Sequence, residues 1–210
     1  MESEKAAFMG KITAGVTHEV KNVLAIIKES AGLLEDIICY AKEGAPPPRD
    51  KFLRTLTRIT EQVARGVDLS NKLNAFAHVP DDKTASVDLN QALVQTEFLS
   101  RRFARLKGMT LNVVPYDGRC TVVTDPLAVQ MILFECISLL MDQVEAGAVI
   151  HLSIEENQGK RIVIQAVGAS DQALAQFASD PCMESVRLIA ERLSMSVRIG
   201  GPPPCIIVGM

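Results

Sequence analysis

The chain has 210 residues, of which 48% are hydrophobic, enough to form the cores of two small domains. Its 22 basic and 25 acidic residues give a formal net charge of -3. This balance offers no polycationic surface, so we do not expect nucleic acid as a partner.

The five cysteines form no C-x-x-C pair and do not cluster with the three histidines. The sequence therefore indicates neither a metal site nor a disulfide framework. The first ten residues include charged side chains and lack the long apolar run that a signal peptide would have, and nowhere in the chain do eighteen apolar residues follow one another. We expect a protein without a membrane segment, and a reducing cytoplasm is its simplest location.

Residues 8–38 form the first predicted helix, because apolar residues recur in steps of three and four along one stripe. The stripe consists of Met9, Ile12, Val16, Val20, Val23, Ile27, Ala31 or Ser30, Leu34 and Ile37. His18 lies two positions from the nearest stripe residues, roughly 200° around the helix, and therefore points away from the stripe. Glu19 follows it, and Asn22 shares its face at i+4. Spacing alone is equally compatible with an ordinary solvated histidine.

The first helix is expected to end near Lys42, where a glycine and three prolines follow, and a second helix is expected over 51–78. A turn centred near Pro47 would place His18 level with Phe76. Two such helices leave an apolar groove, so we predict that two copies form a homodimeric four-helix bundle. The predicted stripe of the second helix is Phe52, Leu56, Ile59, Val63, Val67 or Gly66, Ser70, Leu73 and Phe76 or Ala77.

The second half of the chain is predicted to be an α/β sandwich with helices on one face of a mixed sheet, so that the whole chain is of the α+β class. We expect the helical hairpin over 1–79, a linker over 80–88 and the sandwich over 89–210. Asp88 and Asp125 are expected to cap helices. The helices are predicted over 89–107, 126–145 and 183–195, and the strands over 110–115, 120–125, 148–156, 161–167, 196–201 and 204–210.

The run GVTHEVKNVLAII resembles the phosphoacceptor box of dimeric two-component histidine kinases, in which His-Glu-apolar-polar-Asn precedes an apolar run. The residues from His18 to Asn22 match this pattern position by position, and Val23 stands where a proline is common. The second half resembles the ATP-binding domain of the same kinases. The resemblance implies a homodimer with His18 as the phosphoacceptor.

The chain departs from that family at its nucleotide-binding positions. The asparagine that holds magnesium and phosphates in the kinases falls at or near Ser138, with Glu135 the remaining polar residue nearby. Ala166 stands where an aspartate binds adenine, Gly168 is the one glycine kept in that box, and residues 172–181 are too few for the glycine-rich lid. We therefore expect neither ATP binding nor self-phosphorylation, and no cofactor.

These features favour a histidine phosphotransferase that carries phosphoryl groups between receiver domains of response regulators, similar to pseudokinase-type histidine phosphotransferases. His18 would be the nucleophile and Glu19 would take up or orient its proton. The receiver would bring its own magnesium. Three alternatives remain: a dimeric docking module, a phosphatase module in which Glu19 and Asn22 position water, and a sensor-type kinase that uses ATP.

Overall fold

The computed structural model describes residues 2–39, 48–79, 83–156, 159–167, 181–201 and 203–210. The chain divides into two compact units. One comprises residues 9–78, and the other comprises residues 1–8 together with 79–210. Each unit is described separately below. The expected turn around 44–47 and the segment 168–180, where the kinase lid would lie, are outside the described residues.

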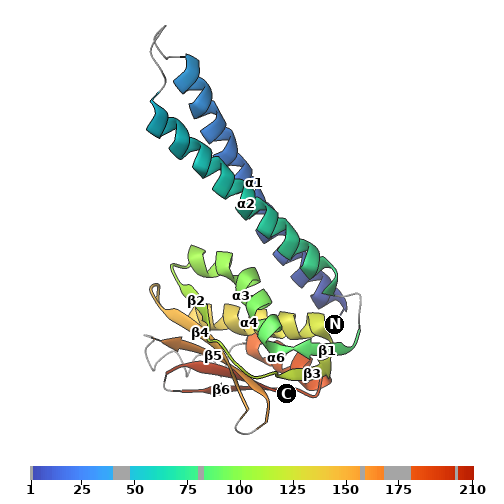
Figure 1. The fold of residues 1–210 in the computed structure, drawn as a ribbon. Helices are drawn as coiled ribbons and strands as arrows, with labels where there is room; N and C mark the ends of the chain where they lie inside the picture. The colour runs from blue at the N-terminus through green and yellow to red at the C-terminus, as the bar shows by residue number, and fades with distance from the viewer. Residues whose placement is uncertain (1, 40–47, 80–82, 157–158, 168–180, 202) are drawn as a thin grey trace. The chain divides into compact units, whose positions relative to one another are not determined.

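The first unit is a hairpin of two long helices, α1 (Glu2–Cys39) and α2 (Arg49–Ala77) (Figure 1). The predicted stripe of α1 is largely buried, with Ile12 at 1% and Val23 at 3% exposure. On α2 the buried residues are Thr55, Leu69 and Phe76. The helices form because these apolar positions repeat every three or four residues and meet along one seam.

The register of the hairpin differs from the prediction. Arg65 Nη2 lies 3.2 Å from Glu19 Oε2, and a Cβ placed on Gly66 would lie 3.3 Å from Val23 Cγ1. Because α1 ends at Cys39 and α2 begins at Arg49, the midpoint of the connection is residue 44 rather than 47. In an antiparallel pair of helices these two contacts place His18 level with residues 66–71 of α2. The prediction that it is level with Phe76 was wrong.

The stripe predicted for α2 is only partly covered within a single chain. Leu56, Val63 and Val67 are 39%, 48% and 55% exposed, and the prediction assigned the covering of this stripe to a second copy. The residues of α2 that are buried within the chain are Thr55, Leu69 and Phe76, of which Phe76 belongs to the predicted stripe. Two apolar rows lie side by side on this helix, and periodicity does not distinguish which of them faces α1.

The second unit contains a five-stranded sheet in the order β2-β4-β5-β7-β6, with β2 parallel to β4 and the other pairs antiparallel. Figure 1 shows helices α3, α4 and α6 on one face of this sheet, which confirms the predicted sandwich. A separate antiparallel pair joins β1 to β3. The elements are β1 (Ala85–Asp88), α3 (Leu89–Leu106), β2 (Thr110–Val113), β3 (Thr121–Thr124), α4 (Pro126–Gln143), β4 (Val149–Glu155), β5 (Arg161–Val167), α6 (Pro181–Arg192), β6 (Ser196–Gly200) and β7 (Cys205–Gly209).

The expected linker over 80–88 includes strand β1, because Val87 is buried and pairs with Val122 of β3. The Asp88 side chain accepts hydrogen bonds from the backbone N–H groups of Asn90 and Gln91 at the start of α3. Asp125 accepts one from Ala128 at the start of α4. Both predicted caps are therefore confirmed, because a carboxylate at this position satisfies N–H groups that have no partner within the helix.

Helix α4 is the core of this unit. Among the described residues it is the one helix long and apolar enough to cross a membrane, yet 72% of it is buried in the fold. Phe134 is fully buried, and its ring centroid lies 5.3 Å from that of Phe103 and 5.4 Å from that of Phe8. Burial on all sides explains the high hydropathy of α4.

The first turns of α1 contribute to this same unit, although the sequence placed them with the hairpin. Phe8 is 3% exposed and packs on Phe134. Lys5 Nζ lies 2.5 Å from Asp125 Oδ2, with both side chains largely covered. An aromatic contact and an ion pair therefore join the N-terminal residues to the start and the middle of α4.

We expect Phe8→Ala to lower the free energy of unfolding of this unit by about 3–5 kcal/mol, because it leaves a cavity against Phe134. The measurement is chemical denaturation followed by circular dichroism. The matched control is Glu2→Ala, whose side chain is 92% exposed and whose removal should change stability by less than about 0.5 kcal/mol. A Phe8→Ala protein as stable as the control would contradict the assignment of residues 1–8 to this core.

Candidate functional site

His18 lies on the solvent-exposed side of α1, two positions after the buried stripe residue Val16 and one helical turn before Asn22. The Asn22 side-chain Nδ2 lies 3.3 Å from His18 Nδ1. The i,i+4 spacing produces this contact, because residues four apart on a helix lie one above the other. With Nδ1 engaged by Asn22, the other ring nitrogen, Nε2, is the atom left for an external group.

The contact with Asn22 couples the tautomer of His18 to the orientation of the Asn22 amide. A neutral imidazole has one N–H donor and one acceptor nitrogen. If Asn22 presents its amide N–H, Nδ1 is the acceptor and the proton lies on Nε2. If the amide turns over and presents Oδ1, the proton lies on Nδ1 and the Nε2 lone pair is available. One residue can therefore hold His18 in either tautomer.

Glu19 is held by α2. Its side chain is 14% exposed, and its Oε2 accepts a hydrogen bond from Arg65 Nη2 at 3.2 Å. Arg65 is itself 44% exposed, so this is a partly solvated ion pair of modest strength. The structure thus brings His18 and Asn22 into direct contact and ties Glu19 to the second helix.

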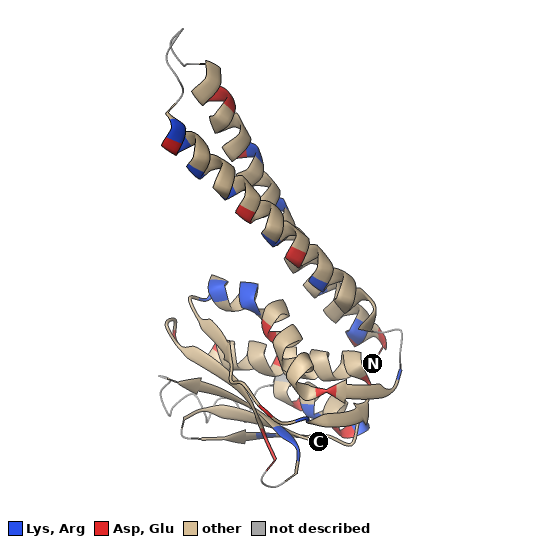
Figure 2. Cartoon of the chain, viewed as in Figure 1, with Lys and Arg blue, Asp and Glu red and all other residues tan. Residues whose placement is uncertain are grey.

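Arg65 is a residue of this site that the sequence analysis missed. Acidic and basic side chains are interspersed along both helices of the hairpin (Figure 2), and no local pattern distinguishes Arg65 from its basic neighbours. Only the hairpin register that the structure shows brings Arg65 to Glu19. That register depends on where the two helices end, and local sequence patterns define helix ends only to within about one or two residues.

In the α/β unit, the described positions that would bind a nucleotide in histidine kinases lack the polar side chains expected there. Ala166 in β5 is fully buried, and its methyl group accepts no hydrogen bond from an adenine amino group. On α4, Glu135 and Ser138 are the half-buried positions amid buried neighbours, and neither provides a side-chain amide. Gly168 lies outside the described residues. The described residues at these positions therefore do not fit ATP.

Comparison with known proteins gives a consistent class. No protein-family model matches the chain. The sensor histidine kinase ZraS of Klebsiella oxytoca is 24% identical over 163 residues, which cover 77% of this chain and 33% of ZraS, so the match spans a third of that relative. The catalytic domain of the histidine kinase ThkA is similar in structure with a TM-score of 0.50 and 10% identity, over 60% of this chain and 94% of that one. A structure described as a bacterial phosphotransferase has a TM-score of 0.47 and 14% identity, over 97% and 95% of the two chains.

The helical region and the α/β sheet domain therefore have the fold of the phosphoacceptor and ATPase domains of histidine kinases. In sequence the chain is similar to a sensor histidine kinase at 24% identity, and its likeness to the solved structures concerns the fold.

We expect Mg-ATP at millimolar concentration to raise the melting temperature no more than magnesium tripolyphosphate does at the same concentration. Tripolyphosphate has the same chain of three phosphates as the nucleotide and lacks adenine, for which Ala166 supplies no side-chain hydrogen-bond partner. A ligand at 100 times its dissociation constant would stabilise the fold by about 2.7 kcal/mol, a shift that thermal denaturation detects readily. A rise in melting temperature with Mg-ATP that tripolyphosphate does not produce would favour the sensor-type kinase that uses ATP.

Proposed function

We propose that this chain is a histidine phosphotransferase, which moves phosphoryl groups between receiver-domain aspartates through His18 and does not use ATP. The observation that carries the proposal is the pairing of an exposed His18 with Asn22 at Nδ1, on a chain whose described nucleotide positions lack the side chains for ATP. Phosphotransfer of this kind needs an accessible imidazole and a partner that brings the phosphoryl group.

In the forward step, the lone pair of His18 Nε2 attacks the phosphorus of an aspartyl phosphate on the receiver. The N–P bond forms as the bond from phosphorus to the aspartate oxygen breaks, and the electron pair leaves with the carboxylate. The imidazole then loses its Nδ1 proton to solvent or to a nearby base. In the second step the imidazole regains a proton at Nδ1, a carboxylate oxygen of an aspartate in another receiver attacks the phosphorus, and the N–P bond breaks with its electron pair returning to Nε2. A receiver supplies magnesium, which offsets the charge of the phosphoryl oxygens.

Asn22 positions His18 for this step. When Asn22 Oδ1 accepts a hydrogen bond from His18 Nδ1–H, the lone pair of Nε2 remains available on the outer side of the ring. Glu19 was expected to take up or orient the proton of His18. Its ion pair with Arg65 supports a second role, in which it fixes α1 against α2 beside the histidine. Glu19→Gln separates the two roles, since the amide oxygen still accepts from Arg65 while the basic carboxylate is lost.

We further propose that the protein acts as a homodimer in which two hairpins form a four-helix bundle. Exposed apolar side chains on both helices support this arrangement. Those on α2 are spaced by three, seven and four residues, so they lie along one side of the helix. They are Leu53, Leu56, Val63 and Val67 on α2 and Leu24 and Ile38 on α1, each between 39% and 59% exposed. Such positions are typical of a helix that faces a second pair of helices.

The partners in this proposal are the receiver domains of response regulators, and the cytoplasm remains the expected location. A phosphatase module is the second candidate. Asn22 is exposed, and its amide can both donate a hydrogen bond to a water molecule and accept one from it. A docking module would need neither His18 nor Asn22 chemistry. The two experiments below separate these candidates.

The first experiment tests the dimer. We expect the wild type to have twice the chain mass by light scattering at micromolar concentration, and the double variant Val63→Glu with Val67→Glu to fall toward the mass of one chain. Two buried carboxylates without partners would oppose association. Arg54→Glu on the opposite side of α2 changes the net charge by the same amount and should leave the dimer intact. A monomeric wild type would rule out the four-helix bundle.

The second experiment tests the transfer. A phosphorylated receiver with labelled phosphate should transfer an acid-labile, base-stable label to the wild type and none to His18→Ala. Because the His18 side chain is exposed, this substitution should change the free energy of unfolding by less than about 0.5 kcal/mol. His151→Ala is the matched control, since it removes an imidazole from β4.

Asn22→Ala should still accept label while losing phosphate to water more slowly. Labelling of the His18→Ala protein would refute the proposed nucleophile. A wild type that accepts no label from any receiver of its host would favour the docking module.

A further inference from the structure

A basic hollow lies on the face of the five-stranded sheet that the helices leave uncovered. Its volume is about 310 Å³. It is lined chiefly by Arg161 of β5, Ser196 and Arg198 of β6, and Ile207 and Gly209 of β7. We call this set of five residues the arginine hollow. Their strand neighbours Ile162, Val197 and Val208 are buried, so the alternation of side chains directs the five toward the opposite face.

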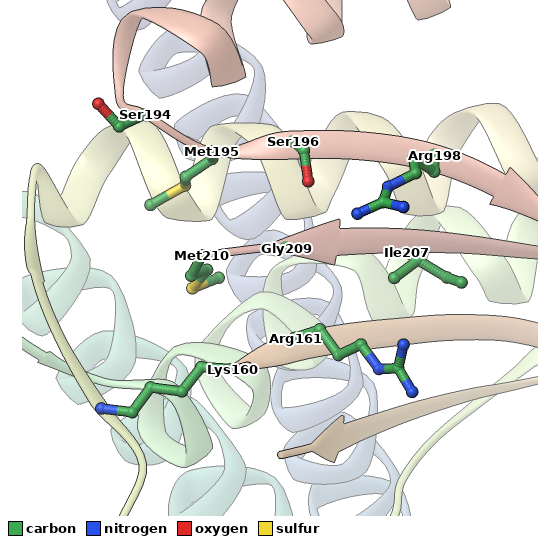
Figure 3. A pocket seen from close by; sticks show the side chains of 9 residues that line it. All are labelled: Lys160, Arg161, Ser194, Met195, Ser196, Arg198, Ile207, Gly209 and Met210. Atoms are coloured by element: carbon green, nitrogen blue, oxygen red, sulfur yellow. The ribbon is translucent and has the colours of Figure 1, made fainter. Parts of the chain in front are cut away.

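The pairing of the strands brings the two arginines to either side of β7. Gly209 is paired with both Arg161 and Ser196, and Ile207 is paired with Arg198. Figure 3 shows the two guanidinium groups level with each other on opposite sides of β7, with Ile207 between them. An anion lying over β7 would therefore meet cationic donors from both neighbouring strands.

Gly209 forms the floor of the arginine hollow. A Cβ placed on it would lie 2.7 Å from Ser196 Oγ, in space that a side chain would fill. The hydroxyl of Ser196 consequently stands over a strand position that has no side chain of its own. A glycine inside a strand gives up packing, and it occurs where another group approaches the backbone closely.

The donors of the two arginines are only partly used. Arg161 Nη2 lies 2.7 Å from Glu155 Oε2, while its Nε is buried and has no hydrogen-bond partner. Arg198 is exposed and makes no ion pair with any residue in the described ranges. Lys160 also borders the hollow, but its ammonium donates to the Thr121 backbone oxygen at 2.6 Å and points away from both arginines (Figure 3). The hollow thus contains two guanidinium groups, of which one is paired with a carboxylate, that of Glu155, within the described residues.

We propose that the arginine hollow binds the dianionic phosphate group of a small molecule. Planar guanidinium groups donate in pairs to phosphate oxygens, and the Ser196 hydroxyl supplies a further donor. A volume of about 310 Å³ holds a phosphate group with a small organic part attached. The arginine hollow lies on strands β5, β6 and β7, whereas His18 lies on α1. The proposal therefore does not depend on the proposed phosphotransfer.

The test is nuclear magnetic resonance of the full chain labelled with nitrogen-15, titrated at constant ionic strength. The probes are inorganic phosphate, glycerol phosphate and an acidic tripeptide of glutamate. Phosphate and glycerol phosphate should shift the backbone amide signals of Ser196, Arg198 and Gly209 to saturation. Tighter binding of glycerol phosphate than of inorganic phosphate identifies a phosphate ester as the ligand class, and the reverse identifies free phosphate. No saturation with either, or saturation with the tripeptide alone, overturns the proposal.

Variants assign the binding to the named residues. Arg161→Gln and Arg198→Gln should each weaken phosphate binding by about tenfold or more, because each removes a charge-assisted contact. Arg119→Gln, an exposed arginine outside the hollow, is the matched control and should leave the affinity unchanged. Gly209→Ala should also weaken binding by placing a methyl group in the floor. Arg198 is exposed, so Arg198→Gln tests the proposal without disturbing the core, and unchanged affinity in this variant would overturn it.

Discussion

The packing of one apolar stripe of α1 against α2 is the constraint on which the candidate site depends. Ile12, Val16 and Val23 are buried along this stripe, and a helix that buries one side must present the other to solvent. His18 and Asn22 lie on the presented side because of their spacing from the stripe. The partly solvated ion pair between Glu19 and Arg65 lies beside the histidine and is consistent with the register that this packing sets. The chemistry of the site is local to α1, but its surroundings are supplied by α2.

The core of the α/β unit does not include all the positions that the resemblance to histidine kinases assigns to nucleotide binding. The core rests on α4, whose Phe134 is fully buried and contacts aromatic rings from α1 and α3. Ala166 is fully buried and Ser138 is half-buried, so both side chains are compatible with the packed fold, although neither is the carboxylate or amide that the resemblance to histidine kinases assigns to its position. A unit of this sort retains a sheet, a helix layer and an uncovered sheet face. The arginine hollow lies on that face, where residues are free of the demands of core packing.

The two units also differ in what their exposed surfaces imply. The hairpin exposes apolar side chains in a regular row on α2, which favours association with another helical surface. The uncovered face of the sheet exposes arginines and a serine around a glycine, which favours a small anion. Both features come from side chains that the individual units do not need for their own stability. They are therefore the places where the chain's interactions with other molecules are to be sought.

The sequence by itself determined the features that depend on residues within a few helical turns of one another. These are the helical periods, the caps formed by Asp88 and Asp125, and the outward direction of His18 with Asn22 above it. Tertiary structure decided the hairpin register, strand β1, the burial of Phe8 and the pairing of Glu19 with Arg65. It also decided which of two apolar rows on α2 is buried. Each of these depends on contacts between residues far apart in the chain, 46 positions in the case of Glu19 and Arg65, and no local period or propensity specifies such a contact.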